Sequence, residues 1–509
     1  MTAAPTKTAR ARRWRRLRLG IAALLLGWFG WYAYLRLTVE PPRSVEDIFK
    51  GITAPGPREP NDATAELTKL ALTVAEEVRY RLPPAPKGMK WTWPAGNTYV
   101  LSPQDVLRGP WTPADRPHLR AVIDYLRDDD TRERIASLHD LRGRPWQFDW
   151  CGSQEPGYDG FCLSHLYRIA FLLVADARYQ HAEQADVVAA WEDLKTALWV
   201  ARDLRIDGTL PAYAQDTCLR TCLDELRFMS REHTLDDDLL KEMDDQLCQL
   251  PSLSRTWPAA ITGEEAVAQA IIDASYTRDA NGQGWFVLSR QWPLSARLLD
   301  FDPVGPDACL PIWNLASFLY NDRQTVEAKR ASCYGALRRV VELDYAEAVA
   351  EAERLTGPGL PFDLLDGRVL CWFCWHSYEN LYSRRVCGEA AREATRVALA
   401  LARFRGEHGA YPQALAELVP AYLSALPADP FSGATFGYRP VGSNDYVLYS
   451  HGRDGDDDGG MPRDPHSGSA DDGDGLYSEP RSKPRDEPSL EPIRGRSRRP
   501  GGHPDEGTP

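Results

Sequence analysis

Apolar positions recur every three or four residues through most of the middle of the chain, which is the spacing of amphipathic helices. The clearest pattern lies between Ser164 and Leu250, where four successive apolar stripes predict four helices. Their members are Leu166, Ile169, Ala170, Leu173 and Ala177; Val187, Trp191, Leu194, Leu198, Ala201 and Leu204; Leu219, Leu223, Leu226 and Phe228; and Leu239, Met243 and Leu247. Short connections between such helices predict a helical bundle or a short helical-repeat array.

Further helices are predicted on both sides of these four. One begins after Asn61 and ends before Pro83, and another falls within residues 117–141. A third is predicted over 264–276, and a long helical run over 322–355 with a break near Asp344. The stretches between them are rich in proline and tryptophan.

Near the C-terminus the pattern changes to a mixed α and β order. A helix is predicted over 383–407, a short helix over 413–418, and two short strands around 436–439 and 446–450. Residues 479–509 mix proline, serine, arginine and acids without apolar periodicity, and we expect them to be disordered.

The N-terminal 18 residues carry seven basic side chains and no acid, and they lead directly into a charge-free run, Leu19 to Leu35. With its flanks this run approaches the length that crosses a bilayer, so we expect a transmembrane anchor over residues 19–37. The charge imbalance places the N-terminus in the cytoplasm and the body outside the inner membrane. A cleaved signal peptide is the alternative, but Trp31 stands where a small residue should precede Ala33.

The chain has 509 residues, of which 43% are hydrophobic and 26% charged, and this composition is that of a folded protein. The formal net charge is −13, and because the leader is basic the rest of the chain is more acidic than the total indicates. An acidic body fits a phosphate backbone poorly, so we expect no nucleic-acid partner.

Ten cysteines in an oxidising compartment indicate some disulfides without fixing their connectivity. Cys151 and Cys162 flank one loop and are the easiest pair to bridge. Cys371-Trp-Phe-Cys374 has the spacing of redox motifs, but no thioredoxin-like alternation of strands and helices surrounds it, and a zinc site would need a second pair. Buried or bridged cysteines are the favoured interpretation.

The sequence has no nucleophile elbow, no phosphate-binding loop and no metalloprotease helix. One region leaves enzymatic chemistry open. The aromatic segment 146–162 contains Asp149, Glu155 and Asp159, which could supply a carboxylate pair for glycosidic chemistry. Acidic residues are common in exposed loops, which is the alternative explanation.

Four motifs follow the predicted C-terminal helix in order: His408 to Pro412, Leu426 to Gly433, Tyr438, and Ser450 to Gly455. In type and order they resemble the globular part of type II secretion major pseudopilins. The central part is also similar to uncharacterised membrane-anchored bacterial proteins that carry such a module. The resemblance implies an α+β fold and ion binding over 381–478.

The chain departs from pseudopilins in two ways. It has no Gly–Phe processing site before the apolar run, and residues 61–380 separate that run from the module. In a pseudopilin one helix continues from the membrane into the globular part. The resemblance therefore implies fold and ion binding rather than secretion.

A calcium site is predicted in the loop after the second strand, where Asp454, Asp456 and Asp458 alternate. Carboxylates this close repel each other unless a cation lies among them, and an irregular loop of oxygen ligands suits calcium. An EF-hand is not expected, because proline stands at the twelfth position. The pseudopilin resemblance implies that Asp472 or Asp474 adds a ligand, and a solvated acidic loop is the alternative.

The sequence thus predicts a mainly α chain with a transmembrane helix, a central helical bundle or repeat-like domain, and a small α+β pseudopilin-like module. Its predicted parts are a basic leader (1–18), the anchor (19–37), a linker (38–60), an extracytoplasmic helical domain (61–380), the module (381–478) and a disordered tail (479–509). We expect a non-catalytic, single-pass envelope protein that binds other envelope proteins or assembles at the membrane. The alternatives are an extracytoplasmic hydrolase using residues 146–162 and a secretion or pilus accessory component.

Overall fold

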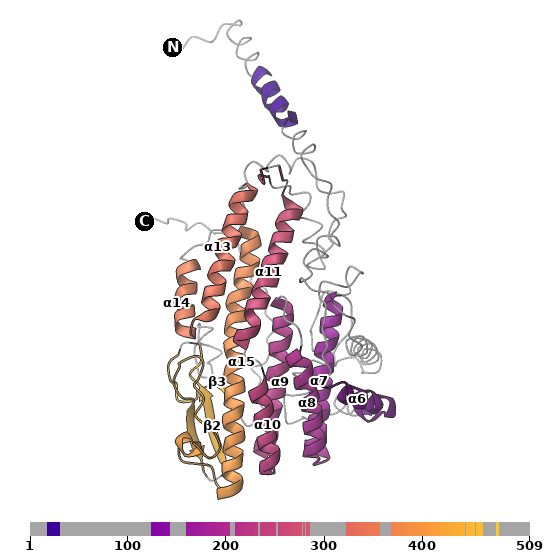
Figure 1. The fold of residues 1–509 in the computed structure, drawn as a ribbon, viewed down its shortest axis with the longest axis vertical. Helices are drawn as coiled ribbons and strands as arrows, with labels where there is room; N and C mark the ends of the chain where they lie inside the picture. The colour runs from indigo at the N-terminus through magenta and orange to yellow at the C-terminus, as the bar shows by residue number, and fades with distance from the viewer. Residues whose placement is uncertain are drawn as a thin grey trace, which may run out of the picture.

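The structure, a computed structural model, describes residues 18–30, 124–142, 159–203, 209–232, 235–250, 253–276, 278–279, 281–285, 322–356, 368–442, 444–453, 455–461 and 475–477. These residues are mainly helical and carry one small sheet, which confirms the predicted mainly α class (Figure 1). The helices are α6 (Asp129–Leu141), α7 (Asp159–Glu183), α8 (Val187–Asp203), α9 (Thr209–Glu232), α10 (Asp237–Gln249), α11 (Leu253–Ser275), α13 (Arg323–Glu342), α14 (Tyr345–Thr356), α15 (Arg368–His408) and the 3-10 helix η3 (Leu415–Leu418). The strands are β1 (Gly437–Val441), β2 (Asp445–Ser450) and β3 (Gly475–Leu476). The predicted linker, the helix after Asn61 and the tail lie outside the described residues.

The four helices predicted between Ser164 and Leu250 are confirmed as α7 to α10. Only three residues join α7 to α8, so the two pack as a hairpin, and α9 contacts both. Their apolar stripes meet in one continuous core, in which the largest fully buried side chains include Trp191, Leu173, Leu194, Leu223 and Leu226. Helix α6 crosses this hairpin instead of running alongside it (Figure 1).

Helices α11 and α13 pack together and extend this core. α11 begins at Leu253, whereas the sequence predicted a start at residue 264. The prediction was late because Pro258, which lies inside α11, is typical of a helix break. The predicted break near Asp344 is confirmed between α13 and α14. The carboxylate of Asp344 accepts a hydrogen bond of 2.9 Å from the backbone N–H of Glu347, so it starts the next helix.

Helix α15 is buried on two faces. One face lies in the core shared with α7 to α11, and the other lies in the core beneath the sheet. The first includes Ala391, Leu399 and Ala402, and the second Ala394, Val397, Ala398 and Leu401. The helix begins at Arg368, before the predicted start at Ser383, and it continues through the predicted boundary between residues 380 and 381. The helical body and the C-terminal module therefore share one helix.

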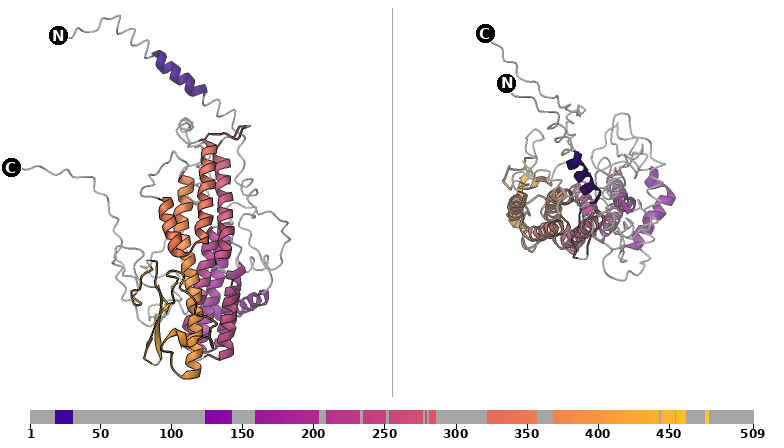
Figure 2. Two further views of the ribbon diagram at one scale, coloured as in Figure 1. Left: turned by 60° about the vertical axis from the view of Figure 1, so that its left-hand side comes forward. Right: turned by 90° about the horizontal axis from the view of Figure 1, so that it is seen from above.

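The sheet flanks the C-terminal half of α15 (Figures 1 and 2). Its order is β1-β2-β3 and both pairs are antiparallel, so the two predicted strands are confirmed and a short third one is added. Gly437 pairs with Tyr449, whose ring lies directly over it. A Cβ on Gly437 would come within 2.1 Å of Tyr449 Cζ, so only glycine fits at this position.

Arginines of α9 join the body to the module. Arg231 forms an ion pair with Asp445 at the start of β2, and its guanidinium lies 5.2 Å from the centroid of the Tyr446 ring. Arg227 donates a hydrogen bond of 2.6 Å to Thr395 of α15 and lies 5.1 Å from the Tyr477 ring centroid. These contacts fix the sheet against the body.

Residues 18–30 are helical, and their apolar side chains are exposed. Within the described residues, no helix is both long enough and apolar enough to cross a membrane. The predicted anchor at 19–37 extends past residue 30, beyond this described stretch, so it stays a prediction.

Candidate functional site

Asp429 joins two of the C-terminal motifs at one completely buried point. Its carboxylate accepts hydrogen bonds from Ser450 Oγ (2.8 Å) and from the backbone N–H of His451 (2.9 Å). Within its own loop it also accepts from the Phe431 N–H (3.2 Å) and from Ser432 Oγ (3.1 Å). Four donors satisfy this buried carboxylate, so the loop 426–433 is tied to the end of β2.

The acidic loop follows directly after this point. Gly455, Gly459 and Gly460 have positive φ angles of 78°, 68° and 80°, which let the backbone turn tightly. Asp457 accepts hydrogen bonds of 2.9 Å from the Gly459 N–H and the Tyr449 hydroxyl. The bond from Gly459, followed by that from Tyr449, lowers the pKa of Asp457. Asp457, which these bonds hold in place, is not one of the alternating aspartates that the sequence predicted as calcium ligands.

Of the predicted calcium ligands, Asp456 and Asp458 lie in this loop, and Asp454, Asp472 and Asp474 lie outside the described residues. No group of three or more potential metal ligands occurs among the side chains that the structure describes. The backbone does bring the two predicted ligand segments toward each other, since Gly475, which follows Asp474, pairs with Ser450 in the sheet. The site stays a prediction.

A second polar cluster, which the sequence did not predict, lies inside the helical body. Asp176 of α7 and Asp193 of α8 are 0% and 2% exposed, and each lies close enough to affect the pKa of the other. Burial raises the pKa of each to about 7, and the neighbouring carboxyl group adds to the effect on Asp176. Each of these carboxyl groups is therefore harder to ionise than an aspartate exposed to solvent.

Helix α6 covers this carboxyl pair from outside. Arg132 Nη1 donates to Asp176 Oδ2 over 2.6 Å, and His139 Nε2 lies 2.9 Å from Asp193 Oδ1. Burial, followed by the charge of Arg142, lowers the pKa of His139. Arg132 and His139 are seven residues apart, which places them on one face of the helix.

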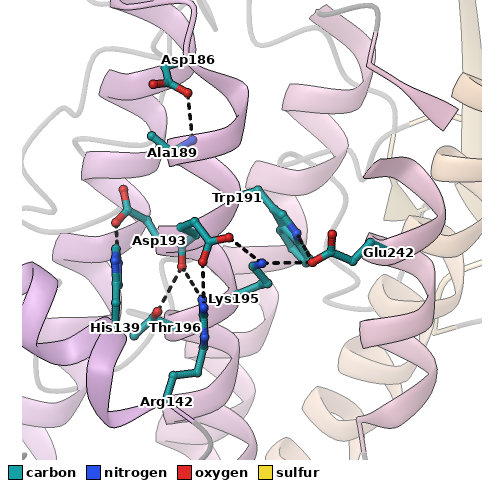
Figure 3. A network of polar contacts seen from close by, with 10 residues as sticks. His139, Arg142, Asp186, Ala189, Trp191, Asp193, Lys195, Thr196 and Glu242 are labelled. Carbon is teal, nitrogen blue, oxygen red and sulfur yellow. Dashed lines mark hydrogen bonds and ion pairs between the residues drawn. The ribbon is translucent and has the colours of Figure 1, made fainter. Parts of the chain in front are cut away.

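Further polar contacts connect this end of α6 to the surface of α8 (Figure 3). Arg142 donates a hydrogen bond of 2.7 Å to the Glu192 carboxylate, which also accepts one of 2.6 Å from Lys195. Lys195 and Trp191 in turn donate to Glu242 of α10, over 3.0 and 2.9 Å. A ladder of polar contacts thus links α6, α8 and α10.

A separate ionic group lies between α7 and α9. Glu225 is completely buried and accepts two hydrogen bonds from Arg178, of 3.1 and 2.9 Å, and lies 2.7 Å from His181 Nε2. Burial by itself raises the pKa of Glu225, but Arg178 and His181 together hold it below its usual value. The charge is balanced inside the bundle, so we assign this group a structural role.

The cysteine side chains that the structure describes form no disulfide. All five are free thiols: Cys218, Cys222, Cys248, Cys333 and Cys387. Burial raises the pKa of Cys218 to about 12 and that of Cys222 well above its usual value, which makes both thiols unreactive. Cys151 and the side chains of Cys162, Cys371 and Cys374 lie outside the described residues, as does most of the segment 146–162 proposed for hydrolytic chemistry.

Sequence reasoning missed the carboxyl pair because the two aspartates lie on different helices and neither belongs to a recognisable motif. Asp176 stands between Ala175 and Ala177, which are both buried, and Asp193 lies near Trp191 and Leu194. The signal available in the sequence was an acidic residue on the apolar face of each helix, where charged side chains are rare.

Comparisons with protein-family models, with curated proteins and with solved structures found no match for this chain.

Proposed function

We propose that this protein is a non-catalytic, single-pass protein of the cell envelope whose helical body and pseudopilin-like module bind other proteins or assemble at the membrane. In this proposal residues 19–37 anchor it in the inner membrane, with the N-terminus in the cytoplasm. Calcium stabilises the C-terminal module.

The observation that carries the proposal is the double burial of α15. In a pseudopilin the long helix continues from the membrane segment into the globular part, so that its first half is free to pack in a filament. In this chain Val386 and Ala390 are buried beside Tyr345 of α14, and Ala391, Leu399 and Ala402 are buried in the body core. The arrangement supports a module fixed to the helical body and disfavours a filament subunit.

The Asp429 contacts support the pseudopilin-like assignment of the module. They bring together the motif from Leu426 to Gly433 and the one from Ser450 to Gly455, which are separate in sequence. Tyr438, the third motif, donates a hydrogen bond of 2.8 Å to the carbonyl of Pro412 at the end of the first. The module thus uses its motif residues to hold its own loops.

The proposal is tested in cells that express the full chain. A reporter that is active only outside the cytoplasm, fused after residue 60, is expected to be active and to remain in the membrane fraction. Crosslinking followed by capture is expected to recover a defined complex with an envelope protein or with further copies of the chain. A released soluble body would contradict the anchor, and a monomer without partners would contradict the binding role. Thin fibres containing the protein in electron micrographs would favour the pilus alternative.

A further inference from the structure

We propose that α14 is a strap that closes over the loop 426–433 of the module, and that the Asp429 side chain controls this closure by holding Phe431 in place. The strap opens when the loop is released. This inference concerns the contact between the body and the module, and it rests on neither the proposed membrane topology nor the calcium site.

α14 is attached to the rest of the protein through few side chains. It folds back beside α13 after a connection of two residues, Leu343 and Asp344 (Figures 1 and 2). Of its described side chains, 345–351, only Tyr345 and Ala348 are buried, whereas α13 buries seven. A helix of 12 residues is marginal in water by itself, so α14 depends on this attachment.

The base of the strap is fixed to α15. Arg385 Nη1 donates a hydrogen bond of 3.1 Å to the carbonyl of Val341, near the end of α13. The Tyr382 hydroxyl donates one of 3.4 Å to the carbonyl of Leu343, and the Asp344 carboxylate caps the first turn of α14. These bonds satisfy backbone groups that the two helix ends leave open, so the bend persists when the rest of α14 moves.

Tyr345 fastens the strap to the module. Its ring centroid lies 4.8 Å from that of Phe431, edge to face, and 6.1 Å from that of Tyr382, with the two tyrosine rings parallel. Tyr345, Phe431 and Val386 are between 6% and 8% exposed and belong to one small apolar cluster. Its buried members belong to neither of the larger cores, so the cluster can open while those cores stay intact.

Asp429 positions the ring that Tyr345 contacts. The backbone N–H of Phe431 donates a hydrogen bond of 3.2 Å to the Asp429 side chain, which Ser450 and His451 of the module hold in turn. Without this acceptor the backbone at Phe431 is freed, and the ring no longer meets Tyr345 at a fixed position. The loop thereby sets the populations of a closed and an open α14.

Opening of the strap uncovers an aromatic surface. Phe431 and Val386 are each 6% exposed while Tyr345 packs in the same cluster, and the ring of Tyr382 loses its stacked partner when Tyr345 leaves. This surface is therefore accessible only when the loop has been released.

Hydrogen–deuterium exchange of the full chain in detergent micelles, followed by mass spectrometry, tests the strap. In the wild type we expect the amides of α14 to exchange faster than those of α13, because α14 opens without global unfolding. Tyr345→Ala removes the fastening. It should raise the exchange rate of α14, relative to that of α13, about tenfold through loss of the aromatic contact.

Asp429→Ala tests the control by the loop and should also raise the relative exchange rate of α14 about tenfold. Because both substitutions act through one contact, the double variant should show about a tenfold rise and not about a hundredfold one. Phe431→Leu keeps an apolar side chain and the hydrogen bonds of Asp429. It should raise the exchange of α14 in the same way, so the test does not depend on the folding of one variant.

Val349→Ala is the matched control, because it shortens an exposed side chain of the same helix and should cause no rise in the exchange of α14. Three results would each overturn the proposal. These are equal protection of α14 and α13 in the wild type, an unchanged α14 in Asp429→Ala and Phe431→Leu, and a rise of about a hundredfold in the double variant.

Discussion

The Ser450 hydroxyl donates a hydrogen bond of 2.8 Å to the buried carboxylate of Asp429, and this contact closes the C-terminal module. It joins the end of β2 to a loop 21 residues earlier in the chain. Asp429 therefore acts as a structural centre of the module, in which four donors meet one side chain.

Replacing Asp429 with alanine is expected to destabilise the protein by about 2–4 kcal/mol, because four donors lose their shared acceptor at a buried position. Urea unfolding of the full chain measures the loss. Ser432→Ala is the matched control, since it removes one partly buried bond and should cost less than about 1.5 kcal/mol. Equal effects of the two substitutions would show that the carboxylate is not the centre of the loop.

Two glycine-to-alanine substitutions are predicted to change the stability of the protein in opposite directions. Gly437→Ala places a Cβ inside the Tyr449 ring, and because backbone and ring must both shift we expect a loss of about 1–3 kcal/mol. Gly406 lies within α15 and has no atom within 4 Å of its added Cβ. Gly406→Ala should therefore stabilise the helix by roughly 0.5–1 kcal/mol. Thermal unfolding compares the variants, and a stable Gly437→Ala protein would contradict the packing of Tyr449.

The extent to which the sequence predicted this fold depends on the kind of signal. The one-sided stripes of α8 and α10 and the break at Asp344 depend on local spacing and capping, and the sequence carries both. The start of α15 was missed because residues 369–375 are a continuous apolar run, which shows no helical period in the sequence. The carboxyl pair was missed because Asp176 and Asp193 come close to each other only after two helices pack. The motif at Asp429 was recognised by its resemblance, but its four donors became visible only in the structure.

The buried ion group of α7 and α9 predicts that a single substitution in it lowers the stability of the protein strongly. Glu225→Gln leaves Arg178 buried without its counter-charge, and we expect a loss of about 3–5 kcal/mol. Glu242→Gln is the control, because this residue is exposed and its bonds to Trp191 and Lys195 are screened by water. It should cost less than about 1 kcal/mol in the same unfolding assay. Comparable losses would mean that the Glu225 group is solvated.

His139 predicts a defined dependence of stability on pH. Its pKa is lowered in the folded protein, so the unfolded chain binds a proton more readily, and stability is lost as the pH falls below 6.5. Glutamine retains a donor for Asp193 and does not titrate. Relative to the wild type, His139→Gln should therefore gain stability between pH 7 and pH 5 in urea unfolding. A constant difference between the two proteins would contradict the lowered pKa.

Calcium should stabilise the module if the acidic loop and the chain before β3 form a site. Asp456 and Asp458 lie in a loop whose glycines turn tightly, and the pairing of Gly475 with Ser450 brings the second predicted segment to the end of the same strand. Extracellular calcium modules bind with dissociation constants of about 10⁻⁴ to 10⁻³ M, so about 5 mM calcium should raise the melting temperature of the full chain. Chelation should reverse the rise, and Asp454→Ala should abolish it. Magnesium at the same concentration controls for charge screening, and Asp245→Ala on α10 controls for loss of an exposed acid. Equal shifts with both ions, or an unchanged shift in Asp454→Ala, would identify the loop as solvated.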